Sequence, residues 1–178
     1  MAYKDETRKT ELDLHWHVFH ERCNLEIHKL FWENSVSIDF KGEQVKTFDT
    51  THHLIQLCIH GCKWNKIPPF FWMADVMTIL KEAKGSIDWD RVVQFSKQHE
   101  VSLILIHTFE FLVKHLHAEI PLSTINELKA HTINTQERKL YNAVINPFTT
   151  FRSFSIKRYQ HHYVTTHLKT QISFYRYL

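Results

Sequence analysis

The chain has 178 residues, of which 43% are hydrophobic and 13% aromatic, and this is enough apolar surface for one domain with a core. Only three residues are glycine, against a usual share of roughly 7%, so neither a glycine-rich phosphate loop nor a dinucleotide fingerprint is expected. The net charge of +3 hides a division, because residues 138–178 hold seven basic side chains and no acidic one.

The sequence also bears on location. Residues 1–11 are polar, and no stretch approaches the roughly 20 apolar residues that a membrane span requires. We therefore expect a cytoplasmic protein without a transmembrane segment. Its three cysteines are an odd number, which favours free thiols over a disulfide framework.

The first predicted elements are strands. Residues 11–19 alternate between polar and apolar side chains, which predicts a strand with one buried face and with Asp13, His15 and His17 on the other face. A short helix is expected over residues 24–33. Two further strands, 36–40 and 44–48, flank a turn that contains Gly42.

Helical patterns follow from residue 49 onward. Thr50 and Thr51 are candidate caps of the first helix, and Asp88 is a candidate cap of a later one. The fold class is therefore α+β, predominantly α, with a short N-terminal strand and a β-hairpin followed by a multi-helix bundle. The predicted helices are residues 70–84, 88–99, 101–117, one from Pro121, 135–145 and a final basic aromatic helix over 148–178.

Four short stretches give a resemblance when they are taken in order. They are Leu12-Asp-Leu-His-Trp16, His53-Leu-Ile-Gln-Leu-Cys-Ile-His-Gly61, Trp72-Met-Ala-Asp-Val-Met-Thr-Ile-Leu80 and Ile87-Asp-Trp-Asp90. Over about residues 10–120 the chain resembles the uncharacterised bacterial nucleotidyltransferase family, within the polymerase-β-like superfamily. This resemblance implies Mg²⁺-dependent transfer of a nucleotidyl group from a nucleoside triphosphate to an acceptor. Together with the predicted elements, it gives three expected parts: a remnant of the catalytic sheet (1–48), a helical domain (49–147) and the basic aromatic C-terminal helix (148–178).

The resemblance assigns a catalytic and metal-binding role to Asp13. In the superfamily, a Gly-Ser turn holds the triphosphate, an Asp-x-Asp pair binds two metal ions, and a third Asp completes the site. Asp13 matches that third position. The other elements would precede Met1, so we expect a truncated chain that is inactive alone and holds no Mg²⁺ tightly, since a lone carboxylate is a poor ligand set.

One segment imitates the missing motifs. Residues 85–90 read Gly-Ser-Ile-Asp-Trp-Asp, but a single residue separates the Gly-Ser from the Asp-x-Asp, which is too close for the superfamily's arrangement. We interpret Asp88 as a helix N-cap instead.

Candidate substrate-binding residues lie within the family stretches or beside them. The resemblance implies nucleotide or acceptor contacts for His15, His60, Lys63 and Asp75. The alternatives are structural: Asp75 can accept a hydrogen bond from a core group, Gly61 can permit close helix packing, and Lys63 can be a solvated charge.

Two soft-metal sites were also considered. Asp13, His15 and His17 share one side of the predicted strand, but a structural role is the simpler account of His15. Cys58 and Cys62 share one face of a helix, from which His60 points away, so buried thiols are the preferred interpretation.

The C-terminal segment suggests a function of another class. Nine aromatic residues accompany its seven basic ones, a mixture that suits nucleic acid, anionic lipid, or simple packing on the acidic body. The alternative to an enzyme is therefore a helical binding module that recognises an anionic partner, either nucleic acid or protein. An unpaired strand at residues 11–19 could also support a homodimer.

Overall fold

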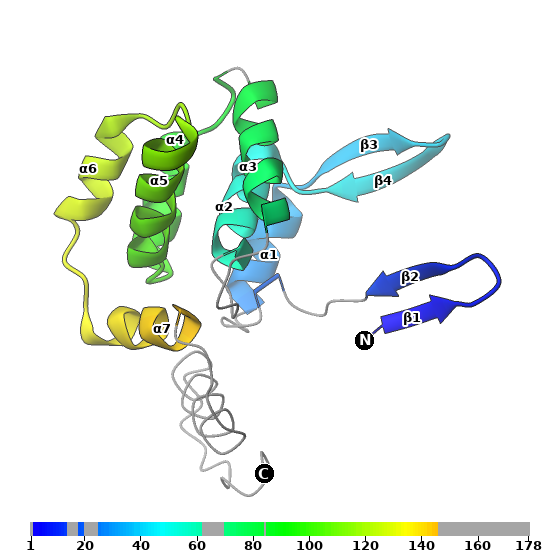
Figure 1. The fold of residues 1–178 in the computed structure, drawn as a ribbon, viewed down its shortest axis with the longest axis horizontal. Helices are drawn as coiled ribbons and strands as arrows, with labels where there is room; N and C mark the ends of the chain where they lie inside the picture. Colours follow the sequence, from blue (N-terminus) through cyan, green and yellow to red (C-terminus); the bar gives the residue numbers. More distant parts are fainter. Residues whose placement is uncertain (1, 14–17, 20–24, 62–69, 84, 146–178) are drawn as a thin grey trace, which may run out of the picture.

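The computed structural model describes residues 2–13, 18–19, 25–61, 70–83 and 85–145 (Figure 1). Within these ranges the chain forms two separate two-stranded sheets and seven helices, which confirms the predicted α+β, predominantly α class. None of the helices in the described ranges is long and apolar enough to cross a membrane. The elements are β1 (Ala2–Asp5), β2 (Thr10–Asp13), α1 (Leu25–Glu33), β3 (Val36–Phe40), β4 (Glu43–Thr47), α2 (Thr50–Gly61), α3 (Phe70–Ala83), α4 (Trp89–Gln98), α5 (Ser102–Leu116), α6 (Leu122–Ala130) and α7 (Thr135–Ile145).

The first hairpin differs from the prediction in two ways. β2 pairs with β1, a strand that the polar sequence Ala-Tyr-Lys-Asp did not reveal. The predicted strand over residues 11–19 begins at Thr10, is described as far as Asp13, and does not include Phe19. The expected buried face was wrong for Leu12, which is 63% exposed because neither face of this small sheet is covered at that position.

The second hairpin was predicted and is confirmed. β3 and β4 pair in antiparallel register, with Ile38 opposite Val45. Lys41 and Gly42 form the turn and both have positive φ, 57° and 88°, as a two-residue turn that matches the twist of the strands requires. Every residue of β3 is exposed, and in Figure 1 the hairpin projects away from the helices.

Side chains fix several helix beginnings. Asp88 caps α4 as predicted, its Oδ1 accepting the backbone N–H of Arg91 at 2.9 Å. α5 begins after Val101, which has no polar side chain, and a distant residue supplies the acceptor instead. The buried carboxylate of Glu137 on α7 accepts the N–H of Leu103 at 2.6 Å. Helix α7 is thereby attached to the start of α5.

The core lies among the helices. Helix α2 contacts α3, α4 and α5, and α5 in turn contacts α6 and α7 (Figure 1). An aromatic cluster joins the beginning of the chain to this bundle, because Phe31 of α1 lies 5.5 Å from Phe19 and 5.8 Å from Phe95 of α4, measured between ring centroids. Edge-to-face pairs of this kind add to the stability gained from burial alone.

Candidate functional site

Asp13 is the last residue of β2, with its Cα paired to that of Ala2. This hairpin lies apart from α2 and α3 in Figure 1, so it does not bring Asp13 to the helices that carry His60 and Asp75. His60 is exposed on α2 and Asp75 is exposed on α3. The other two predicted site residues, His15 and Lys63, lie outside the described residues, as does His17.

The contact between α2 and α3 brings Asp75, a predicted site residue, close enough to His53 for its charge to affect the pKa of that histidine. Burial lowers the pKa of His53 below its usual value, and the negative charge of Asp75 opposes that shift. His60 is seven residues further along α2, close to two turns, which places it on the same side of the helix as His53. The pair of His53 and Asp75 was not predicted, because only the contact between the two helices brings it together.

Gly61 ends α2 against an indole ring. A Cβ atom at this position would overlap Trp72 of α3, coming within 2.6 Å of its Cε3. The indole is 8% exposed, so its ring fills the space next to the glycine. The structure therefore supports the packing interpretation of Gly61.

A second cluster joins the starts of α2 and α4 and was also not predicted. Oδ1 of Asp49 accepts the backbone N–H of His52 at 2.8 Å and so caps α2, while Oδ2 lies 2.9 Å from Nδ1 of His52. Arg91 donates to the same Oδ2 at 3.1 Å. Nearby, the N–H of Asp88 donates to the hydroxyl of Thr51 at 3.0 Å.

The charge of Asp49 is stabilised by this cluster. Burial alone would raise the pKa of the carboxyl, but the His52 backbone and side-chain hydrogen bonds and the charges of His52 and Arg91 together lower it. The sequence contains one signal for the cap, an Asp three residues before His52. It contains no local signal for Arg91, which is 42 residues away in the chain.

His52 has the geometry of an oriented imidazole but not the access that catalysis needs. Its side chain is fully buried, its ring lies 4.7 Å from that of Phe31, and its Nε2 has no hydrogen-bond partner among the residues described. A proton acceptor must come within hydrogen-bond reach of the group that it deprotonates. His52 therefore lacks access to a substrate in this conformation, and its contacts with Asp49 join the starts of α2 and α4 through Arg91.

Within the described ranges, no group of three or more His, Cys, Asp or Glu side chains is placed to hold one metal ion. Cys58 is fully buried, in agreement with the interpretation of a buried thiol, whereas Cys23 and Cys62 lie outside the described residues.

A family model described as uncharacterised nucleotidyltransferase matches residues 1–117, which include β2 with Asp13 and helices α2 to α5. No curated protein and no solved structure matched the chain.

Proposed function

The chain belongs to the uncharacterised nucleotidyltransferase family, and from this membership we propose that it serves Mg²⁺-dependent transfer of a nucleotidyl group from a nucleoside triphosphate to an acceptor. The observation that carries the proposal is the extent of the match. It covers both the strand that ends at Asp13 and the helices that carry His60 and Asp75.

In this proposal Asp13 is a metal ligand. In-line displacement at a phosphate needs metal ions that lower the pKa of the acceptor hydroxyl and neutralise charge on the leaving pyrophosphate. His60 and Asp75, together with His15 and Lys63, would contact the nucleotide or the acceptor. The exposed positions of His60 and Asp75 are compatible with such contacts.

We also propose that these residues do not form a complete catalytic centre by themselves. Mg²⁺ is usually held by one or two carboxylates together with phosphate oxygens and waters, in near-octahedral geometry. β1 places Ala2 opposite Asp13, and the acidic residue two positions before it on β2, Glu11, is ion-paired with Lys4, whose Nζ lies 3.6 Å from its Oε2. Catalysis would need further metal ligands and a triphosphate-binding turn.

Calorimetric titration of the full chain with Mg²⁺ and nucleoside triphosphates tests the incompleteness. We expect no micromolar binding and no incorporation of labelled nucleotide by the chain alone. Micromolar binding that disappears in Asp13→Ala would overturn this part of the proposal, because it would show a site that is already functional.

Nuclear magnetic resonance at millimolar Mg²⁺ and triphosphate tests the role of Asp13 itself. Weak binding should shift the amide signals around Asp13, and Asp13→Asn should abolish those shifts because the amide lacks the negative charge. Glu11→Gln is the matched control, since this exposed residue lies on the same strand and should leave the shifts intact. Shifts that vanish equally in both variants, or that never occur at Asp13, would contradict the assignment.

The second candidate function is a helical binding module for an anionic partner. It is favoured by the seven basic and no acidic residues between positions 138 and 178. One experiment distinguishes the two functions. Binding of a polyanion by the second function should persist in a metal chelator and in Asp13→Ala, whereas nucleotidyl transfer requires both the metal and Asp13.

A further inference from the structure

A row of basic and aromatic side chains extends along the open side of α5 and onto α7. Helices α2, α4 and α6 contact α5 on its other sides, which leaves one side exposed. We call this row the α5–α7 band. It consists of Lys114, Phe111 and His107 on α5, and Tyr141 and Arg138 on α7.

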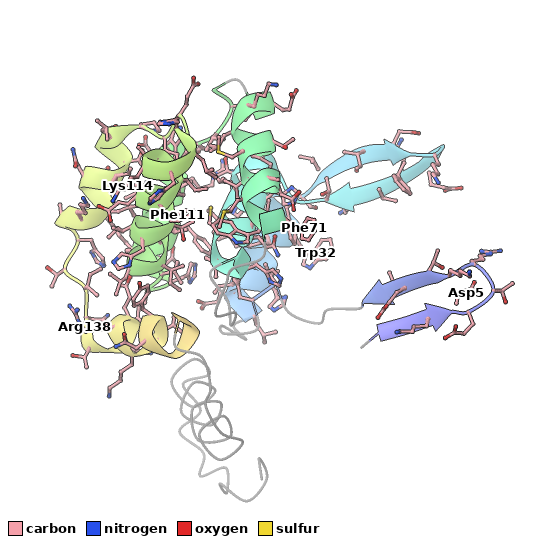
Figure 2. All side chains as sticks on the ribbon, viewed as in Figure 1. Asp5, Trp32, Phe71, Phe111, Lys114 and Arg138 are labelled. Atoms are coloured by element: carbon pink, nitrogen blue, oxygen red, sulfur yellow. The ribbon has the colours of Figure 1, made fainter. Side chains whose placement is uncertain are left out.

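The part of the band on α5 follows helical spacing. His107, Phe111 and Lys114 are separated by four and three residues, so they lie on one face, and all three are exposed. Phe111 is 39% exposed, and its ring lies 4.8 Å from the imidazole of His115. Figure 2 shows Phe111 and Lys114 on this helix.

The band continues across the contact between α5 and α7. The hydroxyl of Tyr141 shares a hydrogen bond with Nδ1 of His107, and the two rings are 4.8 Å apart. Arg138 precedes Tyr141 by three residues, which places it on the same side of α7, and it is exposed. Figure 2 shows Arg138 on α7, beyond the end of α5 that is opposite Lys114.

The charge of the band is positive. Neither Lys114 nor Arg138 forms an ion pair with any acidic side chain in the part of the chain that the structure describes. The exposed acid beside the band, Glu110, is already neutralised by Lys129 of α6, whose Nζ lies 2.6 Å from its Oε1. The band therefore carries two uncompensated cations, one on α5 and the other on α7.

We propose that the α5–α7 band binds single-stranded nucleic acid. The two cations would contact phosphates, and the exposed part of the Phe111 ring would stack on an unpaired base, as aromatic platforms on such proteins do, while the His107–Tyr141 pair would border the path of the strand. His107 and Lys114 are about 10 Å apart along the helix axis at a rise of 1.5 Å per residue, so the band is long enough for several nucleotides. An acidic protein segment would match the charge but would leave Phe111 without a stacking partner.

This assignment does not rest on nucleotidyl transfer. The band contains none of the proposed catalytic or substrate-contacting residues, but Arg138 and Tyr141 belong to the basic segment 138–178, so this part of the assignment rests on the second candidate function. Binding is therefore measured without Mg²⁺ or triphosphate, so that failure here and failure of the proposed enzymatic function are distinguishable.

The test is fluorescence anisotropy of a labelled oligothymidylate with the full chain, in a metal chelator and over a range of salt concentrations. Lys114→Gln and Arg138→Gln should each weaken binding, and each should reduce the slope of log Kobs against log salt by about 0.7 for one lost phosphate contact. Phe111→Ala should weaken binding about tenfold without changing the slope, because it removes stacking rather than charge.

Matched controls separate the band from the remaining surface. Phe71→Ala removes another exposed phenylalanine, on α3, and Lys81→Gln removes another exposed lysine, on the same helix. Both should bind like the unchanged chain. Thermal unfolding followed by circular dichroism checks that each variant folds, and the band substitutions are all at exposed positions.

The possible outcomes decide the proposal. Weaker binding in each of the three band variants, with binding unchanged in the controls, supports it. Binding that survives all three band substitutions places the interaction elsewhere in the chain and overturns it. A polyglutamate peptide of equal charge that competes as well as the oligonucleotide, with no effect of Phe111→Ala, would show an acidic protein partner and also overturns it.

Discussion

Asp75 influences His53 through its negative charge, and this has a consequence for stability. The folded chain holds the pKa of His53 below its unfolded value, because burial disfavours the imidazolium. The unfolded chain therefore takes up a proton at a higher pH than the folded chain does. This contribution to stability is complete above the unfolded pKa of about 6.5 and is lost as the pH falls towards the lowered folded value.

We predict that Asp75→Asn makes the chain more sensitive to acid. Removing the carboxylate removes the influence that raises the pKa of His53, so the folded pKa drops further and the loss of stability extends to lower pH. Urea unfolding midpoints measured from pH 8 to pH 5 should agree with those of the unchanged chain at pH 8 and fall below them at pH 5.

The control for this prediction is the same substitution in a His53→Gln background. Without a titrating side chain at position 53, Asp75→Asn should no longer produce a difference that depends on pH. An equal loss of stability at pH 8 and pH 5 would instead assign Asp75 a structural role that is independent of His53.

For individual residues, the sequence predicts side-chain contacts between residues a few positions apart, but not contacts between residues far apart in the chain. The cap at Asp88 was predicted because the acceptor and its N–H donor are three residues apart. The same spacing exists between Asp49 and His52, but Thr50 and Thr51 were equally good local candidates. Arg91 could not be predicted as a partner of Asp49, because only the packing of α4 against α2 brings the two together.

Among the elements, the contact between α2 and α3 depends on Gly61 having no side chain. Replacing a glycine by alanine in a helix ordinarily stabilises it, by up to about 1 kcal/mol. A methyl group here would instead overlap the Trp72 indole, and such overpacking costs about 1–3 kcal/mol. The steric effect is the larger of the two, and it decides the sign of the expected change.

We predict that Gly61→Ala lowers the free energy of unfolding by about 1 kcal/mol, as measured by urea denaturation. The penalty should shrink in a Trp72→Leu background, where the smaller side chain leaves room for the methyl group, and this double-mutant cycle isolates the contact. Stabilisation by Gly61→Ala in the unchanged background would show that the two helices do not pack as described.

Periodicity was enough to predict most of the elements but not every strand. The helices from α2 to α7 each carry apolar residues at helical spacing, and the alternation around Ile38 and Val45 indicated the second hairpin. β1 was missed because its four residues, Ala-Tyr-Lys-Asp, are too few to show an alternation, and within the described ranges it pairs with β2 alone. The family resemblance pointed to Asp13, whereas no local pattern could reveal that its strand pairs only with β1.

For the whole molecule, stability is expected to be uneven. β3 and β4 are held by their own ladder, and Val36, Ile38 and Phe40 are all more than 40% exposed. A two-stranded hairpin with uncovered faces is marginally stable by itself. In contrast, α2 and α5 contain fully buried core residues, among them Leu54 on α2 and Phe109 on α5.

We predict that backbone amides of the β3–β4 ladder exchange with deuterium much faster than those of α2, α4 and α5. Both groups have hydrogen-bonded amides, so a difference would reflect local opening rather than missing hydrogen bonds. Mass spectrometry of peptides after timed exchange would measure it at several protein concentrations.

Equal protection of the hairpin and the core helices would contradict this picture. Protection that increases with protein concentration would show that a second copy covers β3 and β4, which is a different contact from the one expected at the strand of residues 11–19. Strands β3 and β4 are short, with five residues each, and carry Lys41 in their turn and Lys46 on β4. Both features disfavour aggregation through the exposed strand edges.

The close contact between Gly61 and Trp72 also restricts the order in which this sequence can change over generations. A larger residue at position 61 fits without overlap only after Trp72 has been replaced by a smaller residue. Substitutions at the two positions are therefore expected in that order rather than independently. The exposed strands β3 and β4 carry no such restriction. Descendants of this chain should therefore diverge first in the hairpin and last where α2 meets α3.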